Sequence, residues 1–357
     1  MSNSYLTSKK HSLLSQLPIE NDSGKSILIS RNSKIIIIKE PEMQAVKEIT
    51  YPCKFDGSQQ PAMFYQAKGP GPRPLLVALH TWSGDHTQAS RNYSDFCIEN
   101  DWNFIFPNFR GPNWLEDGCG SELVVSDLED AVAYMKHVTD VDPARVYLVG
   151  GSGGGHCTLL MAGRRPDLWT AVSAWCPISD IAAWHQQCLN TPHKGYSEHI
   201  ESACGGIPAS SEHAGKEARK RSPLTWLPNA ANLTVDISTG IHDGHTGSVP
   251  VSQAIHAYNV LAAPEDRISD QDIAYIVTTE KIPAHLASNE SDPAFGSRPV
   301  YLRKQSNKVR LTLFEGGHDL LPWPALTWLA KQTAGKAPDW SAGRAPSITA
   351  ETTELNK

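Results

Sequence analysis

No run of apolar residues in this sequence is long enough to cross a membrane. A membrane-spanning helix needs about 20 consecutive apolar residues, and the longest apolar stretches here, 35–38 and 75–79, have the length of a strand. The start of the chain also lacks the small-residue cleavage pattern of a secretory signal. We therefore expect no membrane partner and a cytoplasmic location, with a periplasmic or secreted location left open if a leader was removed.

A surplus of positive charge is missing as well. The 357 residues include 32 Lys and Arg against 38 Asp and Glu, which gives a formal net charge of −6. A phosphate backbone binds proteins mainly through Lys and Arg, which displace its counterions, so we expect no nucleic-acid partner. The hydrophobic fraction of 40% is enough for a substantial core. The composition therefore predicts a globular protein, and it leaves open whether the chain forms a homo-oligomer.

Metal-binding and phosphate-binding patterns are also absent. The seven cysteines contain no CxxC pair, so neither a zinc knuckle nor a dense disulfide framework is indicated, and pairing of Cys188 with Cys204 stays open. Histidines near Glu198 and Glu201 lack the HExxH spacing that places two ligands on one helical face. No glycine-rich loop ends in the GK[ST] of a phosphate-binding loop. We expect no metal and no cofactor.

What the sequence does contain is a regular alternation of strand and helix patterns. Two expected antiparallel strands, EMQAVKEITY and AMFYQA, precede the apolar run PLLVALH, which is typical of a buried parallel strand. The alternation then continues to the last helix, PALTWLAKQ, and it favours an α/β fold with a doubly wound, mostly parallel sheet flanked by helices. Further strands are expected at WNFIFPNF, RVYLVGG, TAVSAWCP, LTVDISTG and KVRLTLFEGG, and further helices at ASRNYSDFCIEN, SELVVSDLEDAVAYMKHV, GGGHCTLLMAGRR and VSQAIHAYNVLA.

The same patterns define the domain organisation. Residues 1–40 are expected to form a short N-terminal arm, in which SILIS and KIIIIKE predict a β-hairpin. Residues 41–335 are expected to form one large domain. Two insertions within it, at about 181–228 and 264–297, follow strands at the edge where open α/β sheets bind ligands, so we expect them to act as lids. Residues 336–357 form a polar tail that is expected to be flexible or to dock as an extended strip.

The strongest signal for chemistry is RVYLVGGSGGGHCTLLMAG, in which a buried strand ends at a Gly-Gly pair, Ser152 follows, and a helix begins directly. This is the GxSxG pattern in the strand–turn–helix setting of a nucleophile elbow. Glycines are needed on both sides because the serine backbone is held in a tight, strained turn, where a neighbouring Cβ would collide with the strand or the helix. We predict that Ser152 projects above the sheet as a catalytic nucleophile.

A serine hydroxyl becomes a strong nucleophile only when a base removes its proton. His318 suits that role because it follows the strand VRLTLFE and a Gly-Gly turn, just before the last helix. The acid that orients the base is expected between the two in the sequence and after a strand. We assign this role to Asp243, in the loop after LTVDISTG, with Asp180 and Asp319 as competing acids.

Two main-chain N–H groups are expected to stabilise the negative charge that develops on the substrate oxygen. The N–H of Gly153 is one, because this residue follows the nucleophile directly and begins a helix. The second donor normally comes from the loop after the first long parallel strand. We assign it to the N–H of Trp82, with Thr81 as the second choice.

From about Leu75 to Gln332 the sequence resembles the catalytic domain of the prolyl oligopeptidase family of serine hydrolases, within the α/β-hydrolase superfamily. The matching stretches are FPNFRGP, SDLEDAVAYM, VDPARVYLVGGSGGGH, KRSPLTWLP, STGIHDG and FEGGHD. The resemblance implies an α/β-hydrolase sheet. It also implies the triad of Ser152, Asp243 and His318 that the residues themselves predict.

Departures from the family pattern bear on the substrate. Peptidases of this family carry a long β-propeller ahead of the catalytic domain, whereas a short arm precedes Leu75 here, and LHTWSGD replaces an LHGG-type stretch. We therefore expect a carboxylesterase that acts on acylated sugar or aryl esters. The alternatives are a serine-type peptidase or aminopeptidase that acts on short peptides, and an inactive hydrolase fold used for binding.

Two side chains are candidates for contact with the substrate. Arg110 could hold a substrate carboxylate by a bidentate contact, or it could brace its own loop through backbone carbonyls. Trp184 could form a platform for a sugar or an aromatic acyl group, or it could pack in the core, as could Trp82, Trp114 and Trp175.

Overall fold

The computed structural model describes residues 27–29, 35–37, 45–288 and 290–345, and the chain divides into two units, Met1–Ala45 and Val46–Lys357. In the first unit, β1 (Ile27–Ile29) and β2 (Ile35–Ile37) pair in antiparallel orientation. These strands lie in the two apolar segments from which we predicted a hairpin. The second unit contains every other helix and strand that the structure describes.

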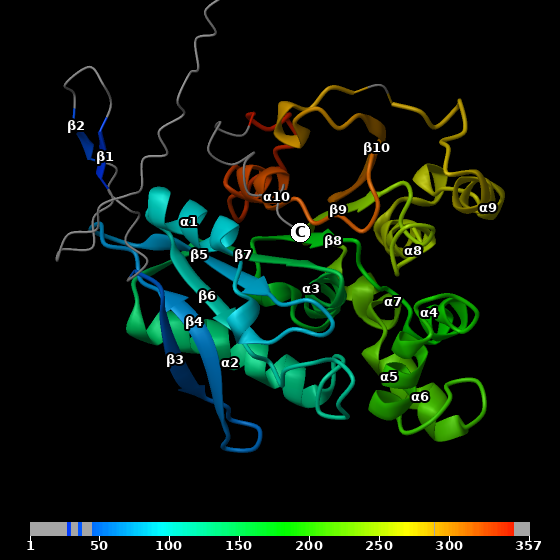
Figure 1. The fold of residues 1–357 in the computed structure, drawn as a ribbon, viewed down its shortest axis with the longest axis horizontal. Coiled ribbons are helices and arrows are strands. Elements are labelled where there is room, and N and C mark those ends of the chain that lie inside the picture. The colour runs from blue at the N-terminus through cyan, green and yellow to red at the C-terminus, as the bar shows by residue number, and fades with distance from the viewer. Residues whose placement is uncertain (1–26, 30–34, 38–44, 289, 346–357) are drawn as a thin grey trace, which may run out of the picture. The chain divides into compact units, whose positions relative to one another are not determined.

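The second unit is built on a nine-stranded sheet with the order β10-β11-β9-β8-β7-β5-β6-β4-β3 (Figure 1). The strands from β11 through β6 in this order run parallel, whereas β10, β4 and β3 pair in antiparallel orientation. The predicted doubly wound, mostly parallel sheet is thus confirmed. The strands are β3 (Lys47–Pro52), β4 (Gln59–Tyr65), β5 (Arg73–Leu79), β6 (Asn103–Pro107), β7 (Val141–Gly151), β8 (Ala171–Trp175), β9 (Thr234–Gly240), β10 (Val300–Ser306) and β11 (Val309–Phe314).

Helices cover both faces of this sheet, as the apolar strands at its centre require. On one face, α1 (Arg91–Glu99) packs against α10 (Pro322–Leu329). On the other face lie α2 (Glu122–Val138), α3 (Gly153–Arg164) and α8 (Ser252–Leu261), whose buried side chains join those of the strands in the main hydrophobic core. Strands such as β6 and β8 are buried along their whole length, which explains their continuous apolar sequences.

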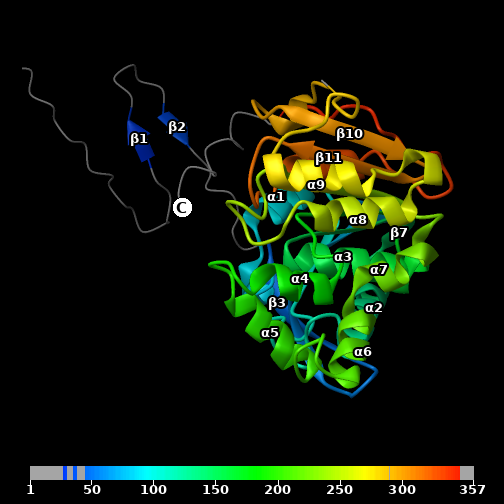
Figure 2. The ribbon, with the colours of Figure 1, turned by 90° about the vertical axis from the view of Figure 1, so that its right-hand side faces the viewer.

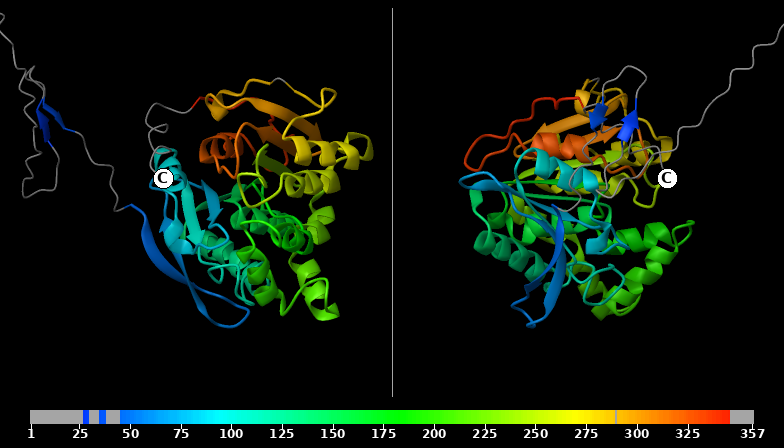
Figure 3. Two further views of the ribbon diagram at one scale, coloured as in Figure 1. Left: turned by 45° about the vertical axis from the view of Figure 1, so that its right-hand side comes forward. Right: turned by 60° about the vertical axis from the view of Figure 1, so that its left-hand side comes forward.

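The first predicted insertion is largely helical, and the second contains one α-helix. The first contains α4 (Ile181–Cys188), α5 (Gly195–Cys204), α6 (Glu212–Arg221) and α7 (Pro223–Trp226), of which α4–α6 gather in one group (Figure 3). The second contains α9 (Asp270–Thr279), which lies beside α8 (Figure 2). Short 3₁₀ turns complete the domain at η1 (His86–Gln88), η2 (Pro166–Leu168), η3 (Leu227–Ala230), η4 (Pro264–Asp266) and η5 (Pro293–Phe295).

The first insertion has a small hydrophobic core of its own. Cys188 and Cys204 lie in this core together with Trp82 and Trp184. Both cysteines are free thiols in the structure, as are the other five. The sequence left a Cys188–Cys204 disulfide open, and in the structure the two residues are separate buried thiols.

The first ten residues of the expected tail dock against the domain. The indole of Trp340 stacks on Trp328 of α10 at 5.4 Å and 8°, and the guanidinium of Arg310 lies over both rings. The side chain of Gln332 also exchanges hydrogen bonds with the backbone of Asp339. The sequence left two outcomes for the tail, flexibility or docking as an extended strip, and these aromatic and amide contacts hold residues 336–345 as an extended strip.

Within the part of the chain that the structure describes, no helix combines the length and the apolar character needed to cross a bilayer.

Candidate active site

Ser152 occupies the sharp turn between β7 and α3. Its backbone adopts φ 57° and ψ −121°, a region that non-glycine residues enter rarely and at a cost of about 1–3 kcal/mol. Two hydrogen bonds hold this conformation, because the Ser152 N–H donates to Trp175 O at 2.9 Å and the Ser152 carbonyl accepts from the His156 N–H at 2.9 Å. The structure thus places Ser152 in the strained turn that the GxSxG pattern predicted.

The backbone of Gly153 lies directly against that of Trp82. A Cβ atom at position 153 would come within 2.5 Å of both N and Cα of Trp82, so only glycine permits this approach. Among the residues that the structure describes, no hydrogen-bond acceptor is recorded for either N–H. The two predicted oxyanion donors are thus close together in space. Each N–H group is available to donate a hydrogen bond to a substrate.

Buried contacts position the loop that carries Trp82. The two ring nitrogens of His80 lie 2.8 Å from Thr81 O and from Asn108 O, and the Asn113 N–H donates to Trp82 O at 2.8 Å. Our sequence reasoning missed Asn113. Its position directly after the FRGP stretch of the family resemblance is the signal that pointed to it.

The imidazole of His318 is joined to the carboxylate of Asp243. Nδ1 of His318 lies 2.8 Å from Oδ2 of Asp243, while Oδ1 of Asp243 accepts from the N–H groups of Gly244 and Val249. The Asp243 side chain is fully buried and that of His318 is 22% exposed. The carboxylate is thus held from two sides, and the contact through Nδ1 leaves Nε2 as the ring nitrogen that could act as a base.

The two competing acids have other partners. Asp180 caps α4 through the Ala183 N–H at 3.0 Å, and Asp319 accepts from Arg298 at 2.7 Å and from the Gly317 N–H at 3.0 Å. Of the three acids that the sequence suggested, Asp243 is the one recorded as a partner of His318.

Contacts between neighbouring segments bring the His318 loop to the edge of the sheet where Ser152 lies. A Cβ at Gly151, the residue before the nucleophile, would collide with the side chain of Leu320. The Cys176 thiol, just beyond β8, donates to Asp319 O at 3.4 Å. Because β7, β8, β9 and β11 are neighbouring parallel strands, the residues after them meet at one edge, as open α/β sheets require of a ligand site.

Cys176 completes the surroundings of the acid and was missed in our sequence reasoning. It is fully buried, and its φ of 44° lies in the left-handed region. Burial raises the pKa of its thiol well above the usual range, and the nearby Asp243 carboxylate raises it further. Its place at the end of the predicted strand TAVSAWCP was the available signal, because side chains that follow parallel strands meet at this edge.

Arg110 is engaged by carboxylates of the protein itself. Its Nε and Nη2 donate to the two oxygens of Asp127 at 2.7 and 2.8 Å, and its Nη1 donates to Asp56 at 2.6 Å. The bidentate contact that we considered exists, but its partner is Asp127 of α2. The guanidinium braces its loop through carboxylates rather than through backbone carbonyls, so we assign Arg110 a structural role.

Trp184 is buried rather than presented as a platform. Its ring packs edge-on against Trp82 at 4.8 Å, and its Nε1 donates to Ser248 O at 2.9 Å. Trp82 in turn donates through Nε1 to His199 at 3.2 Å. The first insertion therefore supports the loop of the second predicted oxyanion donor, and Trp184 belongs to that support.

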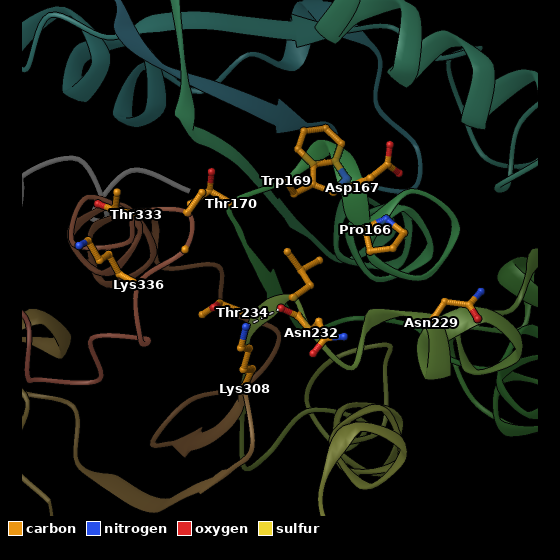
Figure 4. Close-up of a pocket in the computed structure, with 13 residues that line it drawn as sticks. Pro166, Asp167, Trp169, Thr170, Asn229, Asn232, Thr234, Lys308, Thr333 and Lys336 are labelled. Carbon is orange, nitrogen blue, oxygen red and sulfur yellow. Dashed lines mark hydrogen bonds between the residues drawn. The ribbon is translucent and has the colours of Figure 1, made fainter.

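A pocket of about 380 Å³ lies away from these residues (Figure 4). Thr170, Thr234 and Lys308, which line it, stand at or just before the first residues of β8, β9 and β11. Ser152, Asp243 and His318 follow the carboxyl ends of strands. The pocket is thus at the opposite edge of the sheet and is separate from the candidate active site.

The sequence and the fold of this chain are similar to those of known proteins. Residues 98–290 match the prolyl oligopeptidase family. The chain is 28% identical to acylamino-acid-releasing enzyme 1 of Oryza sativa subsp. japonica over 46% of its own length, and 22% identical to the prolyl endopeptidase of Dictyostelium discoideum over 78%. Among solved structures it is similar to Pyrococcus horikoshii acylaminoacyl peptidase, with a TM-score of 0.54 and 12% identity over 89% of this chain.

The chain matches only a part of each of these proteins. The matched part is 22% of the rice enzyme, 36% of the Dictyostelium enzyme and 47% of the Pyrococcus chain. At 12% identity the structural likeness bears on the fold alone, and it supports the predicted α/β-hydrolase sheet.

Proposed function

Because the chain belongs to the prolyl oligopeptidase family of serine hydrolases, we propose that it hydrolyses the peptide bonds of short peptides through an acyl-enzyme on Ser152. The observation that carries the proposal is the meeting of two arrangements at one edge of the sheet. One is the strained Ser152 turn with the N–H groups of Gly153 and Trp82 beside it. The other is the His318–Asp243 pair at 2.8 Å.

The chemistry follows from the roles of these groups. His318 accepts the proton of the Ser152 hydroxyl while Oγ attacks the carbonyl carbon of the substrate, and Asp243 stabilises the imidazolium that forms. The N–H groups of Gly153 and Trp82 donate to the oxyanion of the tetrahedral intermediate. His318 then protonates the leaving amine, and water repeats the attack to release the acyl group.

A peptide is a better-supported substrate than the sugar or aryl ester that we first expected. The relatives are an acylamino-acid-releasing enzyme, a prolyl endopeptidase and an acylaminoacyl peptidase, and each name refers to a peptide or an acylated amino acid. Arg110 and Trp184, which we had considered as ester-binding residues, make contacts inside the protein. The family match therefore favours the peptidase alternative.

The nucleophile is tested by labelling and by mutation. A fluorophosphonate probe is expected to label the protein at Ser152, as mapped by mass spectrometry of the labelled peptide. Ser152→Ala is expected to lose both the label and turnover of peptide p-nitroanilides, with an unchanged melting temperature. Full turnover in Ser152→Ala would refute the proposal, and a folded wild type that takes no label would favour the binding-only alternative.

The substrate class is tested with a matched panel. N-acetyl-aminoacyl p-nitroanilides, free aminoacyl p-nitroanilides and longer peptide p-nitroanilides are compared with acetylated sugars and feruloyl esters. We expect turnover of peptide or N-acylated amides, since acyl transfer to serine serves amides and activated esters alike. Turnover of acetylated sugars without turnover of any amide would restore the esterase assignment.

A further inference from the structure

We propose that Cys176, Asp243 and His318 form an inhibitory site for a thiophilic divalent cation such as Zn²⁺. The inference rests on the proposed function for its consequence, inhibition, but the binding itself depends only on the three side chains. One ligand atom from each, the thiol sulfur, a carboxylate oxygen and an imidazole nitrogen, lies within 4.8 Å of the other two.

The donor set suits zinc. Zn²⁺ binds thiolate sulfur at about 2.3 Å and imidazole or carboxylate at about 2.0–2.2 Å, so ligand atoms around a tetrahedral ion are roughly 3.3–3.7 Å apart. Nδ1 of His318 and Oδ2 of Asp243 are 2.8 Å apart, and the thiol sulfur lies within 4.8 Å of one imidazole nitrogen and one carboxylate oxygen of these residues. Side-chain shifts on the order of 1 Å would bring the three atoms to the distances of a zinc site.

The backbone and the burial of Cys176 fix the place of its thiol. The residue has a φ of 44°, which glycine adopts at no steric cost and which other residues pay for. The side chain held there is fully buried, and its sulfur lies within 4.8 Å of a carboxylate oxygen of Asp243. The 22% exposed side chain of His318 provides the open side from which an ion can enter.

Charge and protons balance when the ion binds. The Cys176 thiol loses its proton to solvent and coordinates as a thiolate, and Asp243 coordinates as a carboxylate, so the two negative charges neutralise Zn²⁺. His318 remains neutral, but its single proton moves from Nδ1, which now coordinates the metal, to Nε2. A water molecule can take the fourth position, as in zinc sites with three protein ligands.

This proton shift explains why the bound ion inhibits. A neutral imidazole with its hydrogen on Nε2 has no lone pair there to accept the proton of Ser152, and Asp243 no longer orients the ring. The ion therefore removes the base from the proposed mechanism without contact with the nucleophile. Removal of the ion by a chelator is expected to restore the original tautomer and the activity.

Binding is measured directly with Co²⁺ as a spectroscopic substitute for Zn²⁺. The wild-type protein is expected to show a thiolate-to-cobalt charge-transfer band in the near ultraviolet, which Zn²⁺ abolishes by displacement. Ser152→Ala is expected to show the same band, because Ser152 is not a ligand. Cys176→Ala and the size-conserving Cys176→Ser are expected to lose the band, whereas Cys97→Ala, which removes another fully buried free thiol, keeps it.

Inhibition is measured on the same proteins with a peptide p-nitroanilide. Loss of a direct ligand is expected to raise the Zn²⁺ concentration for half inhibition by at least about 100-fold in Cys176→Ala or Cys176→Ser, since even the loss of an outer-shell partner costs 10–100-fold in metal affinity. Equal zinc sensitivity in these variants and the wild type, or no cobalt–thiolate band in folded wild type, would overturn the site. A wild type that binds Co²⁺ but hydrolyses no substrate would instead sink the proposed function and leave the metal site standing.

Discussion

Nδ1 of His318 lies 2.8 Å from Oδ2 of Asp243, although 75 positions separate the two residues in the sequence. Asp243 belongs to the loop after β9 and His318 to the loop after β11, and these two strands are parallel neighbours in the sheet. The contact is therefore a product of strand order, and it orients the imidazole that we propose as the general base.

Replacement of this acid tests its orienting role. Asp243→Asn keeps the size of the side chain but favours the wrong tautomer of His318, so we expect kcat for a peptide p-nitroanilide to fall by about 10⁴-fold. The measurement is steady-state kinetics at saturating substrate. Asp180→Asn is the matched control, because Asp180 only caps α4, and it is expected to keep near-normal kcat. Equal losses in both variants would contradict the assignment.

Replacement of Gly153 tests the proposed oxyanion donors. A Cβ there would come within 2.5 Å of the backbone of Trp82, so Gly153→Ala must push the two N–H groups apart. We expect kcat to fall by about 10²–10³-fold, the effect of losing one oxyanion donor. Gly195→Ala is the control, since a Cβ at position 195 meets no atom within 4 Å. Unchanged kcat in Gly153→Ala would argue against this oxyanion site.

Replacement of Asp127 separates a structural Arg110 from a substrate-binding one. Both Arg110 and Asp127 have nearly buried side chains, 9% and 0% exposed, and Asp127→Asn removes the charge that accepts two hydrogen bonds from the guanidinium and leaves Asp56 as its remaining carboxylate partner. Asp127→Asn is expected to lower the free energy of unfolding by about 2 kcal/mol, the scale of a hydrogen bond to a charged group, as measured by urea denaturation. KM for neutral and for carboxylate-bearing substrates is expected to change in parallel. A selective rise in KM for the carboxylate-bearing substrates would revive the substrate-binding role.

His156 predicts a pH dependence of stability. It is fully buried in α3, its Nε2 lies 2.7 Å from Arg221 O, and burial lowers its pKa from 6.5 to about 4. Between pH 6.5 and about 4, His156 is protonated in the unfolded chain but stays neutral in the folded protein. The free energy of unfolding therefore falls as the pH drops from 6.5 toward 4. The expected loss is about 3 kcal/mol.

The measurement is urea denaturation across this pH range. His156→Gln removes the titrating group. Between pH 6.5 and 4 its free energy of unfolding is therefore expected to fall by about 3 kcal/mol less than that of the wild type. Parallel curves for the two proteins would show that His156 titrates normally in the folded state.

Features that depend on neighbouring residues could be read from the sequence. Strands such as β6 and β8 were predicted because burial along their whole length gives them continuous apolar sequences, and the Ser152 turn because GxSxG lay between a strand and a helix. One strand, β10, was not predicted, since in its sequence VYLRKQS three apolar residues are followed by four polar ones, with no alternation. The polar composition of the tail left flexibility and docking both open, because docking depends on Trp340, whose partners Trp328 and Arg310 lie in other elements.

The residues that surround the predicted nucleophile depend on the order of the strands. Local sequence determined that Ser152 lies in a strained turn, because glycine spacing and the strand-to-helix transition are properties of a few consecutive residues. Only the tertiary structure showed that Asp243, and not Asp180 or Asp319, is the partner of His318. It also showed that the Arg110 guanidinium pairs with Asp127 and that Cys176 lies beside Asp243. The physical reason is that a carboxylate, a guanidinium and a thiol each have several candidate partners along the chain, and packing of the parallel strands decides which of them come within bonding distance.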